Sequence, residues 1–330
     1  NEILTDLAGT KPMNRLLNGD VGSGKTVVAM TAIYATALAG YQSALLAPTE
    51  VLANQHAHSF EQRFAPLGKN VALLTGRSST LSGKPIRRAA LIKAIEAGIP
   101  DIVIGTHAIL EEAVQFQSLA LIVVDEQHRF GVAQRAKLQE QAFESADGSD
   151  TTVPHFLTMT ATPIPRTLAL TLFGNLDLSL LDELPKNRQP IITRVAGSEA
   201  ARKKVYAFIE QEIKKGWQAF VILPLVEASK AMEEVKAATT EYERLKNTIF
   251  TDRSVGLVHG RMKAKEKEAI MQAFKTGSLD ILVATAVVEV GIDIPNATVM
   301  LIEGAERFGL SQLHQFRGRI GRGSEQSYCF

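Results

Sequence analysis

The sequence predicts an α/β fold with two tandem domains, each a mostly parallel sheet flanked by helices. Three observations predict it. Short apolar runs alternate with helical patterns along the 330 residues. The apolar runs are continuous, which is typical of strands that are covered by helices on both faces. A polar stretch with two prolines, residues 181–190, interrupts the alternation near the middle of the chain and is the predicted linker.

The length also favours two domains, because single hydrophobic cores stop growing near about 250–300 residues. We therefore expect one domain at residues 1–184 and a second at residues 185–330.

In the first domain, runs of Val, Ile and Leu predict strands, and stretches with helical periodicity lie between them. The predicted strands are 15–17, 43–47, 71–74, 102–104, 119–124 and 155–160. The predicted helices are 26–38, 50–64 and 87–97. In the second domain we expect strands at 191–195, 219–223, 256–259, 281–284 and 298–302, and charged helices at 227–245 and 264–274.

The composition is that of an ordinary globular protein, with 45% hydrophobic and 22% charged residues. No apolar run reaches the roughly 18–20 residues of a membrane span, and no signal-peptide pattern is present, so we expect a cytoplasmic protein without a membrane partner. The single cysteine, Cys329, is expected to be a small buried side chain. The net charge of +1 means that any contact with nucleic acid must be local.

Residues 19–26 form a complete phosphate loop between a predicted strand and a predicted helix. Glycines allow backbone N–H groups to approach phosphate oxygens, and the helix N-terminus adds a positive dipole. Lys25 can reach the β- and γ-phosphates, and the Thr26 hydroxyl can ligate Mg²⁺. ATP and Mg²⁺ are therefore the expected ligands. The predicted nucleotide-binding residues here are Gly19, Asp20, Val21, Gly22, Ser23, Gly24, Lys25 and Thr26.

The apolar run 121–124 ends in two acids, Asp125 and Glu126. Mg²⁺ prefers oxygen ligands, so Asp125 is a predicted metal ligand. Glu126 is expected to orient the attacking water. Two of the histidines, His56 and His58, face apart on their predicted helix and have no cysteine partner, so we predict no metal site built on histidines.

Residues 315–323 read Gln-Phe-Arg-Gly-Arg-Ile-Gly-Arg-Gly. Arg319 and Arg322 are spaced i, i+3, so we expect them to share a helix face, with Gly318 and Gly321 beneath them. Arginines stabilise the charge that spreads over the γ-phosphate during phosphoryl transfer. The predicted catalytic residues are Glu126, Lys25, Arg319 and Arg322. Because the arginines lie in the second predicted domain, we expect hydrolysis to depend on closure of the two domains.

The order of these motifs resembles that of the superfamily 2 helicases over essentially the whole chain. The resemblance also rests on residues 158–163, 283–285 and 291–293. Within that superfamily, residues 125–131 and 160–167 resemble the RecG helicases, bacterial DNA translocases that remodel replication forks. The resemblance implies two RecA-like domains with the ATP site in the cleft between them.

The resemblance further implies an ATP-dependent DNA helicase that remodels stalled replication forks and recombination junctions during DNA repair and recombination. It implies a monomer, associated with the nucleoid, that contacts forked and junction duplexes through the phosphate backbone. The implied DNA-binding residues each follow a predicted strand, and helix capping is a compatible second role for their hydroxyls. They are Pro48, Thr49, Thr106, His107 and Thr285.

Other roles also come from the resemblance. Gly291 and Asp293 are implied nucleotide-binding residues, and Asp293 is expected to face the ribose and the arginines. The residues implied to couple the nucleotide site to DNA are His128, Thr160, Thr162 and Gln315.

The chain departs from the RecG pattern in three places. Residues 1–12 contain no glutamine, whereas the family has an adenine-recognising glutamine upstream of the loop. The N-terminal wedge domain and the C-terminal segment beyond the last motif are also missing. Since the chain begins at Asn1 and ends inside an apolar run, we expect a fragment of a longer protein.

Four alternatives remain at this stage. A transcription-repair coupling factor shares the Pro-Ile-Pro-Arg-Thr wording of residues 163–167, but typically has Glu in place of Gln127. A superfamily 2 RNA helicase shares the overall motif order. A transport or switch ATPase shares the phosphate loop but needs further motifs that are not found. A non-catalytic module is disfavoured because Lys25, Asp125 and Arg322 are all present.

Overall fold

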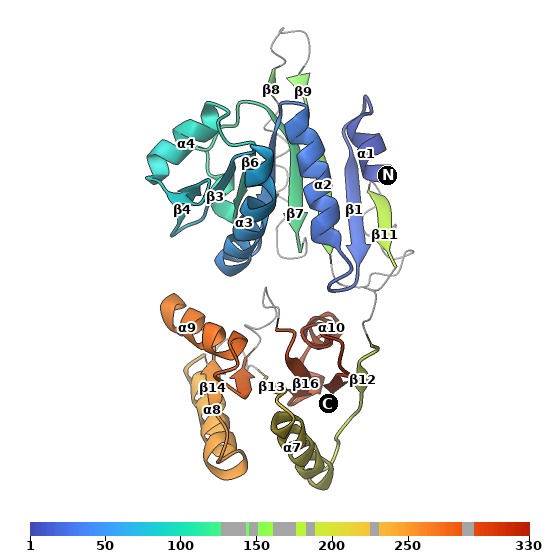
Figure 1. Ribbon diagram of the computed structural model, residues 1–330, viewed down its shortest axis with the longest axis vertical. Helices are drawn as coiled ribbons and strands as arrows, with labels where there is room; N and C mark the ends of the chain where they lie inside the picture. The colour runs from blue at the N-terminus through green and yellow to red at the C-terminus, as the bar shows by residue number, and fades with distance from the viewer. Residues whose placement is uncertain (127–142, 145–150, 161–175, 183–188, 225–230, 286–293) are drawn as a thin grey trace. The chain divides into compact units, whose positions relative to one another are not determined.

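The computed structural model describes residues 1–126, 143–144, 151–160, 176–182, 189–224, 231–285 and 294–330. The chain divides into two compact units, Asn1–Glu183 and Leu184–Phe330 (Figure 1). Each unit is built on its own mostly parallel sheet, so the predicted fold class is confirmed.

The described elements of the first unit alternate between strands and helices. Its strands are β1 (Asn14–Gly19), β2 (Gln42–Leu46), β3 (Val71–Leu74), β4 (Ser79–Leu81), β5 (Lys84–Pro85), β6 (Ile102–Gly105), β7 (Leu119–Asp125), β8 (Phe143–Glu144), β9 (Thr151–Thr152), β10 (His155–Thr160) and β11 (Asp177–Leu181). Its helices are α1 (Glu2–Leu7), α2 (Lys25–Leu38), α3 (Glu50–Phe64) and α4 (Arg88–Glu96), with short 3₁₀ turns η1 (Ala65–Leu67) and η2 (His107–Leu110).

The described elements of the second unit follow the same alternation. Its strands are β12 (Ile192–Thr193), β13 (Gln218–Ile222), β14 (Val255–Val258), β15 (Ile281–Ala284), β16 (Ala297–Ile302) and β17 (Tyr328–Cys329). Its helices are α7 (Glu199–Lys214), α8 (Ala231–Arg244), α9 (Ala264–Lys275) and α10 (Leu310–Arg317), with a π-helical turn η5 (Leu245–Ile249) after α8 and a 3₁₀ turn η7 (Ala305–Arg307).

The main sheet of the first unit has the strand order β11-β1-β10-β7-β2-β6-β3-β4-β5. Strands β11 to β3 pair in parallel, and β4 and β5 join as an antiparallel edge. Successive side chains of a strand point to opposite faces. Leu45 and Val123 therefore pack with α2 and α3 on one face, while Leu46 and Val124 belong to a core cluster on the other.

The second sheet is parallel throughout, with the order β12-β17-β16-β13-β15-β14. Val221 lies in one core cluster with residues of α7 and α8. Phe220 lies in another cluster, with Phe274 of α9 and Phe316 of α10. Both sheets are thus covered on two faces, which explains why their strands are continuous apolar runs. Cys329 is buried, as expected, and burial raises the pKa of its thiol to about 11.

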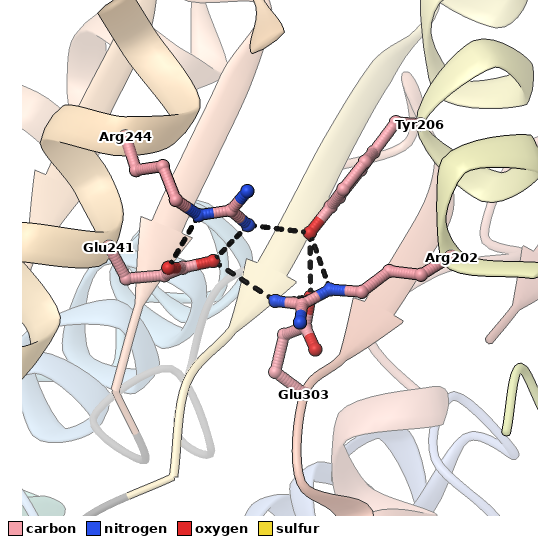
Figure 2. Close-up of polar contacts among 5 residues, drawn as sticks. All are labelled: Arg202, Tyr206, Glu241, Arg244 and Glu303. Carbon is pink, nitrogen blue, oxygen red and sulfur yellow. Dashed lines mark hydrogen bonds and ion pairs between the residues drawn. The ribbon is translucent and has the colours of Figure 1, made fainter. Parts of the chain in front are cut away.

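Five polar residues join α7, α8 and the end of β16 in the second unit (Figure 2). Arg202 of α7 donates to Glu303, directly after β16, at 2.9 Å, and to Glu241 of α8 at 3.1 Å. Tyr206 donates to Glu303 at 3.0 Å and accepts from Arg244 at 3.0 Å. The two guanidinium groups also lie 5.7 and 5.8 Å from the centre of the Tyr206 ring, within cation–π range.

The charges in this network balance, since two arginines face two glutamates. Burial raises the pKa of Tyr206, and the neighbouring Glu303 carboxylate raises it further. The phenol therefore stays protonated and remains a donor to Glu303. We infer that the network fixes the two helices against the carboxyl end of β16.

Most predicted elements are confirmed, and three expectations are wrong. The predicted linker began at Leu181, but Leu181 is the last residue of β11 and pairs with Gly19. The strand expected at 191–195 is only Ile192–Thr193. The helix expected to carry Arg319 and Arg322 ends at Arg317, because Gly318 is its C-cap.

Replacing Glu303 with alanine should lower the free energy of unfolding of the second unit by about 1–3 kcal/mol, because Arg202 and Tyr206 lose a charged acceptor. We expect a loss at the lower end of this range, because the Arg202 side chain is 38% exposed and water replaces part of its interaction with Glu303. Glu306→Ala is the control, since Glu306 is 78% exposed, and it should change stability by no more than about 0.5 kcal/mol. Urea unfolding followed by circular dichroism measures both variants, and equal losses would contradict the role of the network.

Candidate functional site

The carboxyl edge of the first sheet brings together most of the predicted site residues of the first unit. Parallel strands end at the same edge, and the register pairs Asn18 with Thr160, Met159 with Asp125, and Leu46 with both Val124 and Gly105. The side chains that follow these strands are therefore arranged in strand order. The phosphate loop comes first, then Thr160, then Asp125, then the segments after β2 and β6.

The phosphate loop turns sharply from β1 into α2. Gly22 and Gly24 have φ values of +81° and +94°, a backbone conformation that residues other than glycine rarely adopt. Gly19 must also lack a side chain, because a Cβ there would lie 2.5 Å from Ser23 Oγ and 2.9 Å from Leu181 Cβ. Backbone conformation thus requires glycine at two positions of the motif, and close neighbouring atoms require it at Gly19.

Lys25 is buried, and its ammonium group folds back onto the loop. Its Nζ donates to the carbonyl oxygens of Gly19 at 2.7 Å and Asp20 at 2.8 Å. These bonds satisfy a cation that would otherwise be costly to bury. They also hold the Lys25 ammonium directly beside the loop that is expected to bind phosphate.

Two further features fit a phosphate group. The Ser23 Oγ is buried and has no hydrogen-bond partner among the described residues. The N-terminus of α2 has no side-chain cap, in contrast to α3, where Thr49 accepts from the N–H of Leu52 at 3.3 Å. An anion at the N-terminus of α2 would meet its N–H groups and the positive end of its dipole.

The two acids lie at the end of β7. Asp125 is the last residue of the strand, and Glu126 follows it with a φ of +54°. That backbone region is strained for a residue with a side chain and is typical of functional positions.

Asp125 has a partner that sequence reasoning missed. His56 of α3 lies with its Nε2 2.9 Å from Asp125 Oδ2, and both side chains are largely buried. From the sequence, His56 was considered only as a possible metal ligand. The spacing along the chain carries no signal for this contact, since the two residues are 69 positions apart.

Four of the predicted DNA-binding residues line one pocket of about 540 Å³. Pro48 and Thr49 follow β2, and Thr106 and His107 follow β6. Thr49 caps α3, and Thr106 precedes η2 without capping it through its side chain. The full lining is Pro48, Thr49, Glu50, Gly76, Thr106, His107, Ala108 and Glu111.

The two acids of this pocket are partly neutralised. Glu111 pairs with Arg88 at 2.7 Å, and Glu50 lies 3.7 Å from Arg77. The pocket therefore presents hydroxyl and imidazole groups without a large excess of negative charge.

In the second unit, the described site residues lie after β15 and around α10. Thr285 follows β15, and its buried Oγ1 has no hydrogen-bond partner among the described residues. Gln315 is buried within α10. Arg319 and Arg322 follow the helix, where Arg322 Nε donates to the Gly318 carbonyl at 3.3 Å. The chain turns at Gly321, whose φ is +70°, so the two arginines do not share a helix face.

Four predicted site residues lie outside the described residues. They are His128, Thr162, Gly291 and Asp293.

Two family models of known proteins match the chain, one in each unit. A family model of the DEAD/DEAH box helicases matches residues 2–171, and a model of the helicase conserved C-terminal domain matches residues 201–324. The chain belongs to the DEAD/DEAH box helicase family. The resemblance to superfamily 2 helicases inferred from the motifs is confirmed at this level.

Within the helicases, the chain is similar to RecG over its whole length. It is 52% identical to the ATP-dependent DNA helicase RecG of Synechocystis sp., covering 100% of this chain and 38% of that protein. It is 50% identical to RecG of Aquifex aeolicus, covering 99% of this chain and 39% of the relative. A solved structure of RecG bound to a three-way DNA junction matches with a TM-score of 0.76 and 42% identity, over 100% of this chain and 41% of that one. The chain thus spans less than half the length of these helicases.

Among the described residues of this chain, no helix is long and apolar enough to span a membrane, and no three His, Cys, Asp or Glu side chains lie close enough together to hold a metal ion.

The phosphate loop allows a matched test of its glycines. Gly24 and Gly40 both have positive φ values, at +94° and +85°, and both have open space where a Cβ would lie. Gly24→Ala and Gly40→Ala should each lower stability by about 1–2 kcal/mol through the same backbone strain. Only Gly24→Ala should weaken binding of a fluorescent ATP analogue, because Gly40 lies beyond the other end of α2. Equal nucleotide affinity of the two variants would contradict the assignment of the loop.

Proposed function

We propose that this chain is the ATP-driven motor of a DNA helicase that remodels stalled replication forks and recombination junctions. The observation that carries the proposal is the order of groups along one sheet edge. The phosphate loop, Thr160, Asp125 and the pocket beyond β2 and β6 follow one another on neighbouring parallel strands. Similarity to proteins named ATP-dependent DNA helicase RecG supports DNA as the substrate.

The nucleotide would bind through the loop. The N–H groups at the start of α2, the Ser23 hydroxyl and the Lys25 ammonium would bind its phosphates. Thr26 and Asp125 provide the hydroxyl and carboxylate oxygens that suit Mg²⁺, together with nucleotide oxygens. Mg²⁺, when bound, neutralises charge on the phosphates during transfer. Gly291 and Asp293 are proposed to complete the nucleotide site.

The proposed hydrolytic roles belong to four side chains. Glu126 orients and polarises the attacking water, and Lys25 exchanges its carbonyl partners for phosphate oxygens. Arg319 and Arg322 of the second unit stabilise the charge on the transferred phosphoryl group. Because the loop belongs to the first unit and these arginines to the second, hydrolysis would depend on domain closure. Such coupling of hydrolysis to domain motion is what a motor requires.

DNA is proposed to bind through its phosphate backbone. The hydroxyls of Thr49 and Thr106, the imidazole of His107 and the segment at Pro48 line the pocket described above. Thr285 of the second unit would add a further hydroxyl. Such contacts are independent of sequence and need little net positive charge.

Four residues are proposed to couple the two ligands, and the structure describes two of them, Thr160 and Gln315. Thr160 ends β10, the strand between the phosphate loop strand and the Asp125 strand. The other proposed coupling residues are His128, Thr162 and Gln315. We further propose a monomeric enzyme that works at the bacterial nucleoid, with a wedge domain and a C-terminal segment in the whole protein.

ATP hydrolysis by the purified protein with different nucleic acids tests this proposal. Forked DNA should stimulate hydrolysis most, followed by linear duplex, with single-stranded DNA and RNA well below. Lys25→Ala should abolish hydrolysis with every nucleic acid while thermal unfolding shows a folded protein. Stimulation by RNA equal to that by forked DNA would overturn the DNA assignment, and undiminished hydrolysis by Lys25→Ala would overturn the nucleotide site.

Arg322→Ala should reduce ATP turnover by two or more orders of magnitude with little change in nucleotide affinity, because its charge is needed mainly in the transition state. Steady-state turnover and equilibrium binding of a fluorescent ATP analogue separate the two effects. Arg307→Ala is the control, since Arg307 is an exposed arginine of the same unit outside the motif. A large affinity loss with unchanged turnover would instead assign Arg322 to phosphate anchoring.

A further inference from the structure

The contact between His56 and Asp125 joins a helix to the strand end that carries the proposed metal ligand. His56 Nε2 lies 2.9 Å from Asp125 Oδ2, and the side chains are only 8% and 13% exposed. Asp125 is the last residue of β7, so its backbone is held by the ladder with β10. Two structural elements therefore meet at a single carboxylate oxygen.

The ring of His56 is fixed by the packing of α3. Ala53, His56, Ala57 and Phe60 form the buried face of this helix at helical spacing. The Phe60 ring, which is fully buried, meets the His56 ring edge to face at 6.4 Å and 88°. Because the helix is anchored in the core by that face, the imidazole has little freedom to turn away from Asp125.

The direction of the hydrogen bond follows from the chemistry of the pair. An ionised carboxylate only accepts, so the imidazole must donate through Nε2–H. This bond occupies Oδ2 of Asp125 and restrains rotation of the carboxylate. Oδ1 then remains for a metal ion or for a water in its shell.

We propose that His56 is a positioning residue that holds the Asp125 carboxylate in the orientation required to bind Mg²⁺. This inference rests on the function proposed above, in which Asp125 is a ligand of the nucleotide-bound metal. Hydrogen bonds to a ligating carboxylate from a neighbouring side chain orient it, and their loss commonly weakens metal affinity by about 10–100-fold. In this role His56 acts on the metal through Asp125 and is not itself a ligand.

Two amide substitutions separate positioning from packing. The Gln side-chain nitrogen can reach the position of His56 Nε2, whereas the shorter Asn side chain reaches only the position of Nδ1. His56→Gln should therefore preserve the bond to Asp125, and His56→Asn should lose it. His58→Asn is the control, because His58 is an exposed histidine of the same helix that contacts Gln62 instead.

Binding of fluorescent ADP is measured at equilibrium without Mg²⁺ and over a series of Mg²⁺ concentrations. The Mg²⁺ concentration that gives half-maximal ATP hydrolysis is measured as well. His56→Asn should raise the Mg²⁺ requirement about tenfold or more in both measurements and leave metal-free ADP affinity unchanged. His56→Gln and His58→Asn should stay within about twofold of the unsubstituted protein. Should His56→Asn fail to fold, His56→Leu takes its place, because it keeps an apolar body against Phe60 and lacks a donor.

The outcomes distinguish the inference from the proposed function. Mg²⁺-independent ADP binding and hydrolysis by the unsubstituted protein would overturn both. A Mg²⁺-dependent protein whose His56→Asn variant keeps the normal Mg²⁺ requirement would overturn the positioning role alone. Loss of metal-free ADP binding, or unfolding of both the Asn and the Leu variant, would assign His56 to the fold and also overturn the proposal.

Discussion

The parallel hydrogen-bonded ladder of the first sheet is the constraint on which the candidate site depends. Parallel pairing places the ends of β1, β10, β7, β2 and β6 at one edge, so residues far apart in sequence follow one another across it. The helices that return the chain cover both faces and leave this edge to loops. Loops on a rigid sheet can carry polar groups that a core could not accept. The phosphate loop after β1 and the pocket after β2 and β6 are thus held by the same ladder.

The second unit uses the same architecture but adds an ionic network where α7 and α8 meet the end of β16. Arginine and glutamate are costly to bury alone, and here the two arginine side chains stay 38% and 40% exposed while they pair with the glutamates and share a tyrosine hydroxyl. Residues of both helices pack in the apolar cluster of the sheet, whereas the network joins α7 and α8 to Glu303 through hydrogen bonds and ion pairs. Charge balance and packing therefore act on different parts of the same helices.

Much of the fold could be predicted because buried parallel strands are continuous apolar runs, as in β7 and β15. The edge strand β11 was missed because its five residues, although three of them are leucines, run directly into the polar, proline-containing stretch that predicts a linker. The arginines were placed on a helix face because spacing alone cannot show that Gly318 ends the helix. The phosphate loop and Asp125 could be predicted as site residues because their patterns are local in sequence. His56 was not, because its contact is made only by tertiary packing.

In the proposed nucleotide site, the two bonds from Lys25 to the carbonyls of Gly19 and Asp20 would make nucleotide binding a competition between partners for the ammonium. A phosphate would take the ammonium from partners at 2.7 and 2.8 Å, so part of its interaction energy would go into breaking contacts within the protein. When the product left such a site, the same carbonyls would accept the ammonium again. The protein's own carbonyls would then offset part of the cost of releasing the nucleotide, which would favour repeated cycles over tight retention of product.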